Sequence, residues 1–121
     1  MVLSSKVRMT ENIRHRQTEV SEAINKGVEC SYLYCITMPS CEKNLLDIHP
    51  YRELYKRKEY DRPFFILGLA ENRSGAVGIV TEMAAEVAAS VEKPEDFKGA
   101  FIRYRDSFFS YSYEEDQTGK E

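Results

Sequence analysis

Cysteine is scarce in this chain, with three residues among 121, and an odd number cannot pair completely in disulfides. Three thiols fit a reducing cytoplasm better than they fit a disulfide framework. The first residues also lack the apolar core of a signal peptide. A chain of this length buries roughly two thirds of the surface that its unfolded form exposes, so it needs no cross-link. We therefore predict a cytoplasmic protein of one domain without disulfides.

Long apolar runs and an excess of basic charge are also missing. The longest apolar run is the segment 64–70, whereas a membrane helix needs about 20 residues. The formal net charge is −3, so no overall positive field attracts nucleic acid or anionic lipid. Basic residues and tyrosines alternate over 51–62, as in single-strand binding proteins, but an amphipathic helix with inward tyrosines explains the same spacing. We expect neither a membrane nor a nucleic-acid partner.

The segment 64–92 carries the clearest structural signal. The apolar run 64–70 is bounded by Pro63 and by polar residues, and it predicts a strand buried on both faces. Ser74 is suited to cap a helix from Gly75 to about Glu92. Its apolar residues share one arc of about 140° that we expect to face the sheet. They are Ala76, Val77, Val80, Met83, Ala84, Val87, Ala88 and Val91.

The chain before this segment predicts a helix, a strand and a second helix. A helical arm occupies residues 1–26, and Gly27 ends it. Residues 28–38 are rich in β-branched and aromatic side chains and predict the first strand. A short helical turn follows at 41–47, and Pro50 begins a helix that leads back to the central strand. Strand, crossover helix and strand would form a parallel unit.

After the long helix the pattern changes twice. Residues 93–96 carry the start signals of a helix that continues to about Arg105. Aromatic residues alternate with serine over 109–113, which is typical of a half-buried strand. The acidic segment 114–121 is expected to be disordered. Together these elements predict one α/β domain over 1–113, with α+β as the alternative, in which helices cover a two- or three-stranded sheet in two layers.

The cysteines and His49 have the residue types of a zinc site but not its spacing. Zinc sites take ligand pairs two to four residues apart, whereas Cys30 and Cys35 are five apart on a predicted strand and would point to opposite faces. We therefore expect no metal. Cys41 precedes a predicted helix start, where the helix dipole lowers a thiol pKa. This order resembles thioredoxin-like proteins without their second cysteine, because Asn44 takes its place, and Cys41 is the candidate catalytic nucleophile.

Glycines around the predicted strand-to-helix turn suggest a ligand site. Gly68, Gly75 and Gly78 match neither the phosphate loop nor the dinucleotide fingerprint. The polar groups at the helix start can nevertheless hold an anion such as phosphate or a nucleotide. The candidate ligand-binding residues are Asn72, Arg73, Ser74 and Gly75.

Two predicted surfaces suggest contacts with protein. The outward face of the long helix carries small residues and few charges, which would let another helix approach closely. The predicted strand at 109–113 can pair with a sheet edge in the same chain or in a neighbour. The candidate interface residues are Gly78, Ala85, Ala89, Phe109, Tyr111 and Tyr113.

The segment LLDIHP at 45–50, the ILGLA strand at 66–70 and the helix to Val91 resemble small bacterial α/β proteins of uncharacterised function. The resemblance covers about half of the chain and rests on structural motifs. It implies a bacterial cytoplasmic accessory protein, and it implies no activity, ligand or site residue.

No catalytic arrangement accompanies these surfaces, because neither His15 nor His49 has a serine or acid at a recognisable triad spacing. We expect a non-catalytic interaction or regulatory module that binds itself or another protein and takes no cofactor. One alternative is a small-ligand or anion binder at 72–75. Another alternative is a thiol-dependent enzyme at Cys41.

Overall fold

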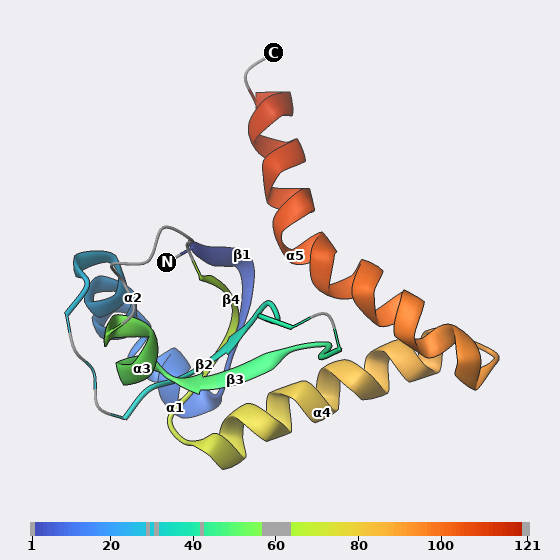
Figure 1. The fold of residues 1–121 in the computed structure, drawn as a ribbon. Coiled ribbons are helices and arrows are strands. Elements are labelled where there is room, and N and C mark those ends of the chain that lie inside the picture. The colour runs from blue at the N-terminus through green and yellow to red at the C-terminus, as the bar shows by residue number, and fades with distance from the viewer. Residues whose placement is uncertain (1, 29, 31, 42, 57–63, 120–121) are drawn as a thin grey trace.

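The computed structural model describes residues 2–28, 30, 32–41, 43–56 and 64–119, and the side chains of all of these except 55, 56 and 110–119. Within these ranges the chain alternates strands and helices (Figure 1). In chain order they are β1 (Val2–Met9), α1 (Glu11–His15), α2 (Gln17–Lys26), β2 (Tyr34–Thr37), β3 (Asp47–Pro50), α3 (Tyr51–Lys56), β4 (Phe65–Ala70), α4 (Arg73–Ser90), the 3₁₀ turn η1 (Pro94–Asp96) and α5 (Phe97–Gly119).

The four strands form one sheet in the order β1-β4-β2-β3, which places β4 inside the sheet as predicted. The α/β class is confirmed, and the sheet has four strands where we expected two or three. β1 runs parallel to β4, whereas β2 is antiparallel to both β4 and β3. The predicted parallel unit of 28–38 and 64–70 is therefore wrong. The first of these strands is also shorter than predicted, since β2 covers only Tyr34–Thr37.

Helices cover both faces of the sheet, so the structure has three layers where we predicted two (Figure 1). The helices α1, α2 and α3 pack on one face, and α4 and α5 pack on the other. The core of the first face is formed by Ile13, Val20, Ile24, Leu33, Cys35, Tyr51, Leu54, Ile66 and Leu69. The core of the second face is formed by Ile36, Leu67, Ala70, Ala76, Ile79, Met83, Val87, Phe101 and Phe108.

The strand β1 occupies part of the segment that we predicted as a helical arm. Only Ser4 of its eight residues is buried, and the strand lies at an edge of the sheet. Its pairing with β4 is irregular, because the register shifts between Leu3 and Arg8. Within this irregular stretch the Ser4 hydroxyl donates a hydrogen bond of 2.6 Å to the Phe108 carbonyl of α5. An edge strand of this kind lacks the alternation by which strands are recognised in a sequence.

The helical part of the arm docks on the sheet of its own chain. Ile13, Val20 and Ile24 are all buried in the first core. The helix breaks at Arg16, where φ is −112° and ψ is 22°, so α1 and α2 are separate helices. Gly27 ends α2 in the left-handed conformation with φ of 68°, as predicted for a C-terminal glycine.

The segment after β2 differs from the prediction. Residues 43–46 form a turn and irregular chain instead of a helical turn, and the Asn44 N–H donates to the Cys41 carbonyl at 3.0 Å. The next residues form β3, which ends at Pro50 on the second sheet edge. Proline is tolerated there because an edge strand leaves one row of backbone groups unpaired.

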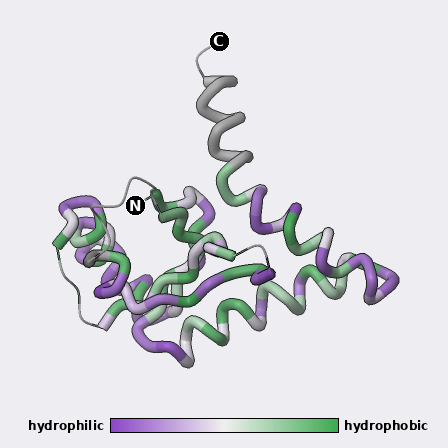
Figure 2. The backbone as a smooth tube through the Cα atoms, viewed as in Figure 1, coloured by the Kyte–Doolittle hydropathy of each residue, from purple (hydrophilic) through white to green (hydrophobic). Residues whose placement is uncertain are grey.

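The long helix α4 is confirmed, although its start and its buried face differ from the prediction. Asn72 caps it in place of Ser74, because the Asn72 side chain accepts from the Gly75 N–H at 2.7 Å. Ile79 is buried and Val77 is 45% exposed, the reverse of the predicted arc. Apolar residues occur around the whole helix (Figure 2), so periodicity alone could not fix its orientation.

The helix α5 replaces the strand predicted at 109–113, which was wrong. The helix continues to Gly119 and so covers most of the acidic segment for which we predicted disorder. The Arg105 guanidinium donates to the Leu45 carbonyl at 2.7 Å and ties α5 to the chain before β3. In Figure 1 the last turns of α5 extend beyond the sheet layers.

Candidate functional site

The three cysteines have different surroundings in the structure. Cys35 lies in the core of the first face and Cys30 packs against the same core, so the prediction of opposite faces is wrong; β2 begins only at Tyr34, after Cys30. Burial raises the pKa of the Cys35 thiol to about 12. Cys41 is exposed, and the helix expected after it is replaced by a turn. Among the described residues, no three His, Cys, Asp or Glu side chains are grouped for a metal ion.

The predicted anion site at the start of α4 is largely occupied by the helix itself. The Gly75 N–H is already bonded to the Asn72 side chain. A Cβ at Gly75 would lie 3.2 Å from atoms of Ala70 and Thr10, so this glycine allows close packing against the preceding elements. Asn72, Arg73 and Ser74 are exposed. Close packing therefore accounts for a glycine at position 75. Because its N–H is already bonded, the helix start offers an anion fewer free N–H donors than we expected.

The exposed side of α4 carries the small residues that were predicted as an interface. Gly78, Ala85 and Ala89 are all exposed, and no atom lies within 4 Å of a Cβ placed at Gly78. Figure 1 shows α4 along the border of the molecule, with its far side uncovered. We define the α4 outer face as the exposed residues Ser74, Val77, Gly78, Thr81, Ala85, Ala88 and Ala89.

The α4 outer face carries few charges, and the exposed Glu82 and Glu86 lie along one of its borders. Its one hydroxyl in the middle of the helix, on Thr81, donates to the Val77 carbonyl at 2.8 Å and is satisfied within the helix. The nearby Glu86 is engaged on the sheet side, where its carboxylate pairs with the Arg8 guanidinium at 2.5 and 2.7 Å. The hydrogen bond from Arg8 lowers the pKa of Glu86. The outer face is therefore a strip of uncharged residues with Glu82 at its border.

The other predicted interface residues lie on α5. Phe109 is half-buried, and its ring meets the Phe65 ring edge-on with the centroids 5.2 Å apart. Tyr111 and Tyr113 belong to the helical part of α5 whose side chains lie outside the described set. They cannot extend a sheet edge, because the backbone there is helical. The edges of the sheet are β1 and β3 instead.

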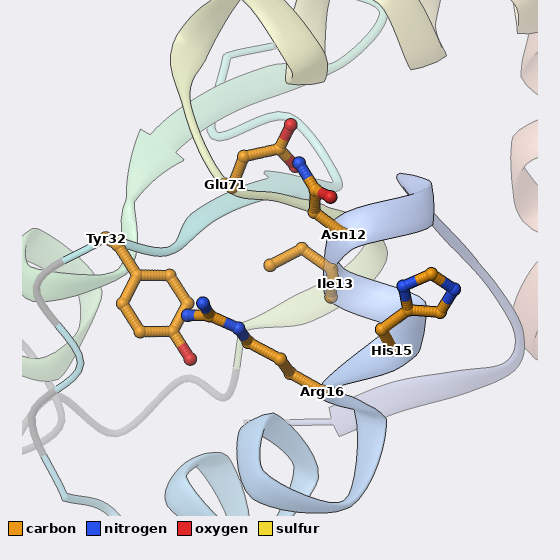
Figure 3. A pocket seen from close by; sticks show the side chains of 6 residues that line it. All are labelled: Asn12, Ile13, His15, Arg16, Tyr32 and Glu71. Atoms are coloured by element: carbon orange, nitrogen blue, oxygen red, sulfur yellow. The ribbon is translucent and has the colours of Figure 1, made fainter.

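A pocket that we did not predict lies beside α1 (Figure 3). Its volume is about 410 Å³. It forms where the end of β4, the break between α1 and α2 and the chain before β2 meet. We call it the α1 pocket, and its lining residues are Asn12, Ile13, His15, Arg16, Tyr32 and Glu71.

The two sides of the α1 pocket differ in charge. On one side the Glu71 carboxylate accepts a short hydrogen bond from the Thr10 hydroxyl and a further one from the Asn12 side chain. The Thr10 bond is the main reason that the pKa of Glu71 is lowered. On the other side the Arg16 guanidinium carbon lies 5.3 Å from the centre of the Tyr32 ring, a cation–π contact. A carboxylate and a guanidinium therefore flank one hollow.

A second polar group lies on β3. His49 Nε2 is 3.6 Å from Asp47 Oδ2, and its Nδ1 is 3.9 Å from Glu53 Oε2. Burial alone would raise the pKa of Asp47, but hydrogen bonds from Ser40 and Asn44 outweigh it and the pKa is lowered. Since Ser40 donates to Asp47 and not to His49, the group lacks the geometry of a catalytic triad. It secures the chain that enters β3.

Only the local part of the α1 pocket could have been found in the sequence. The run Asn12–Arg16 is polar and partly basic, but its neighbours Tyr32 and Glu71 lie far along the chain. Glu71 lies next to this run because Thr10 follows β1, Glu71 follows β4, and the two strands are parallel neighbours. The missed strand β1 therefore also concealed the pocket.

Comparisons with protein-family models, with curated proteins and with solved structures found no match to this chain. Within the described residues, no helix has the length and apolar character needed to span a bilayer. A function for the chain therefore has to follow from its own surfaces.

Proposed function

We propose that the protein is a non-catalytic interaction module that forms a homodimer through the α4 outer face. A helix that covers a sheet normally exposes charged residues on its opposite side. Here seven exposed positions over about 22 Å of helix carry only Ser, Thr, Gly, Ala and Val, and the exposed charges of α4 are limited to Arg73 at its start and to Glu82 and Glu86 along one border. The inner face of α4 is already packed through Ala76, Ile79, Met83 and Val87, so the outer face serves no contact within the described chain.

The spacing of the small residues favours a second copy as the partner. Ser74, Gly78, Ala85 and Ala89 are placed symmetrically about a point between residues 81 and 82. In an antiparallel two-fold pair, Gly78 would therefore face the partner's Ala85, and Ser74 would face the partner's Ala89. A two-fold contact must be complementary to itself, and this strip meets that condition. Glycine and alanine at the centre allow two helix backbones to approach closely.

The proposed dimer is a modest one. A single pair of helices buries less than the about 1,600 Å² of a standard interface, so we expect a dissociation constant near micromolar. Gly78 also supports a contact role, because glycine inside a helix costs about 1 kcal/mol relative to alanine and no neighbour among the described residues requires it. We place this module in the cytoplasm, because its three cysteines are free thiols.

The substitution Ala85→Glu tests the interface. Ala85 is exposed and glutamate is a good helix former, so the monomer should keep its fold. In the dimer each introduced carboxylate would be placed opposite the partner's Gly78 in a dry contact, where burying an unpaired charge is costly. We expect sedimentation velocity to show at least about tenfold weaker dimerisation, which corresponds to about 1.4 kcal/mol.

Thr18→Glu is the matched control, because Thr18 is exposed on α2 and the change adds the same charge away from α4. It should leave dimerisation unchanged. Equal association of the Ala85→Glu and wild-type proteins would refute the interface. A wild-type protein that remains monomeric at several hundred micromolar would refute the function.

A further inference from the structure

We propose that the α1 pocket binds a small zwitterion, a molecule with one carboxylate and one ammonium group. This inference does not depend on the dimer, because none of the lining residues belongs to α4. The volume of about 410 Å³ is within the range of small-molecule sites. Figure 3 shows the Glu71 and Asn12 side chains on one side of Ile13 and the Arg16 and Tyr32 side chains on the other.

The Arg16 side provides the carboxylate site. No described carboxylate forms an ion pair with Arg16, whose guanidinium instead lies against the Tyr32 ring. The guanidinium also hydrogen-bonds the Tyr32 hydroxyl, which in turn donates to Glu19 at 3.5 Å. Since a guanidinium has five N–H donors, others remain to receive a carboxylate. The imidazole of His15 adds a further polar group to the lining of this pocket.

The Glu71 side provides the ammonium site. Its lowered pKa means that the carboxylate is ionised at neutral pH, and Thr10 and Asn12 fix its position. Since the Asn12 side chain donates its N–H to Glu71, its amide oxygen remains to accept from a ligand. Two oxygen acceptors of this kind match the donors of an ammonium group.

The apolar residue between these ends limits the ligand further. Ile13 is 1% exposed and forms the floor of the pocket between the two polar sides. A ligand with only a negative charge would be repelled by the Glu71 carboxylate. A ligand with only a positive charge would be repelled by the Arg16 guanidinium. A short zwitterion with a methylene chain over Ile13 compensates both charges.

The first experiment is an NMR titration with ω-amino acids of increasing length: glycine, β-alanine, γ-aminobutyrate and ε-aminocaproate. Butyrate and butylamine carry one charge each on a comparable chain and serve as controls. We expect amide shifts at Ile13, Arg16 and Glu71, with one chain length preferred and a dissociation constant of about 1 mM or lower. If butyrate or butylamine binds as well as the best zwitterion, or if no zwitterion shifts these amides, the proposal is overturned.

Substitutions then locate the two charges. Arg16→Gln and Glu71→Gln should each weaken the preferred zwitterion at least about tenfold, which is the loss typical of one charge-assisted contact. Arg14→Gln is the matched control, because Arg14 is exposed on α1 but does not line the pocket, and its affinity should match the wild type. Far-UV circular dichroism confirms the fold of each variant. Equal affinity of Arg14→Gln and Arg16→Gln would contradict the assignment of the carboxylate site.

Discussion

The substitution Gly68→Ala tests how the centre of the sheet is packed. A Cβ at Gly68 would lie 2.7 Å from Ile36 Cδ1 and 3.4 Å from Ile36 Cβ, and Ile36 is fully buried. The φ of Gly68 is not positive, so alanine is compatible with the backbone. Overpacking of this kind costs about 1–3 kcal/mol, and the reduced entropy of the unfolded chain offsets about 0.5–1 kcal/mol. We expect a net loss of about 1–2 kcal/mol.

Ile36→Val removes the atom responsible for the conflict. Alone it should destabilise by about 1 kcal/mol, because it leaves a small cavity. In the double variant the alanine methyl group at position 68 would fill that space. We expect the double variant to lose less than the sum of the single losses by about 1–2 kcal/mol.

Urea unfolding followed by far-UV circular dichroism provides these free energies, and it is preferable to fluorescence because the chain has no tryptophan. All four proteins should be compared at one concentration, since dimerisation adds to apparent stability. Additive losses in the double variant would show that Ile36 is not the neighbour that excludes a side chain at Gly68, and the packing argument would fail.

Three further predictions concern single groups. Tyr104→Phe should raise the free energy of unfolding in urea by about 1 kcal/mol, because the Tyr104 hydroxyl is buried and has no hydrogen-bond partner among the described residues. A lower free energy of unfolding would contradict this and reveal a partner. Gly27→Ala should destabilise by about 1 kcal/mol, because φ is 68° there, and Gly27→Asn should cost less. The pKa of Glu71 is lowered from 4.5, so the folded state binds its proton less readily than the unfolded state. Stability from Glu71 is therefore present above about pH 4.5 and lost as the pH falls through the lower folded pKa. Acid unfolding curves should accordingly fall less steeply below about pH 4.5 for Glu71→Gln than for the wild type.

The sequence predicted the elements whose signals are local. The strand β4 is an unbroken apolar run buried on both faces, and the helix α4 follows it in a long stretch without helix breakers other than glycine. The end of α2 at Gly27 could also be predicted from the local sequence, because glycine adopts the left-handed conformation without strain. These features depend on a residue and its immediate neighbours.

Edge elements were missed because their partners lie far along the chain. The strand β1 buries only Ser4, and its pairing with β4 joins residues at least 60 positions apart. The strand β3 was missed because it ends at Pro50, directly before α3, whose start was predicted to within one residue. The serine and aromatic alternation at 109–113 has the period of a strand, yet the segment continues α5 as a helix. Short runs of this kind fit either structure until packing decides.

The candidate sites divide in the same way. The α4 outer face could be predicted in part, since Gly78, Ala85 and Ala89 belong to one helix and recur with its period. The α1 pocket could not be predicted, because it requires the parallel pairing that brings Glu71 next to residues 10–16. The two opposite charges of this pocket could not be assigned to one site until the fold showed that three distant segments lie together.

The most direct test of the dimer is a pair of distances between spin labels. The labels are attached to Thr81→Cys or Ser74→Cys in a background of Cys30→Ser and Cys41→Ser, while Cys35 is fully buried and cannot react. Antiparallel pairing of α4 predicts Cα separations of about 10 Å between the two copies of residue 81 and about 24 Å between the two copies of residue 74. Similar distances at both positions would contradict it, and so would the absence of dipolar coupling in labelled proteins that sedimentation velocity shows to be dimeric.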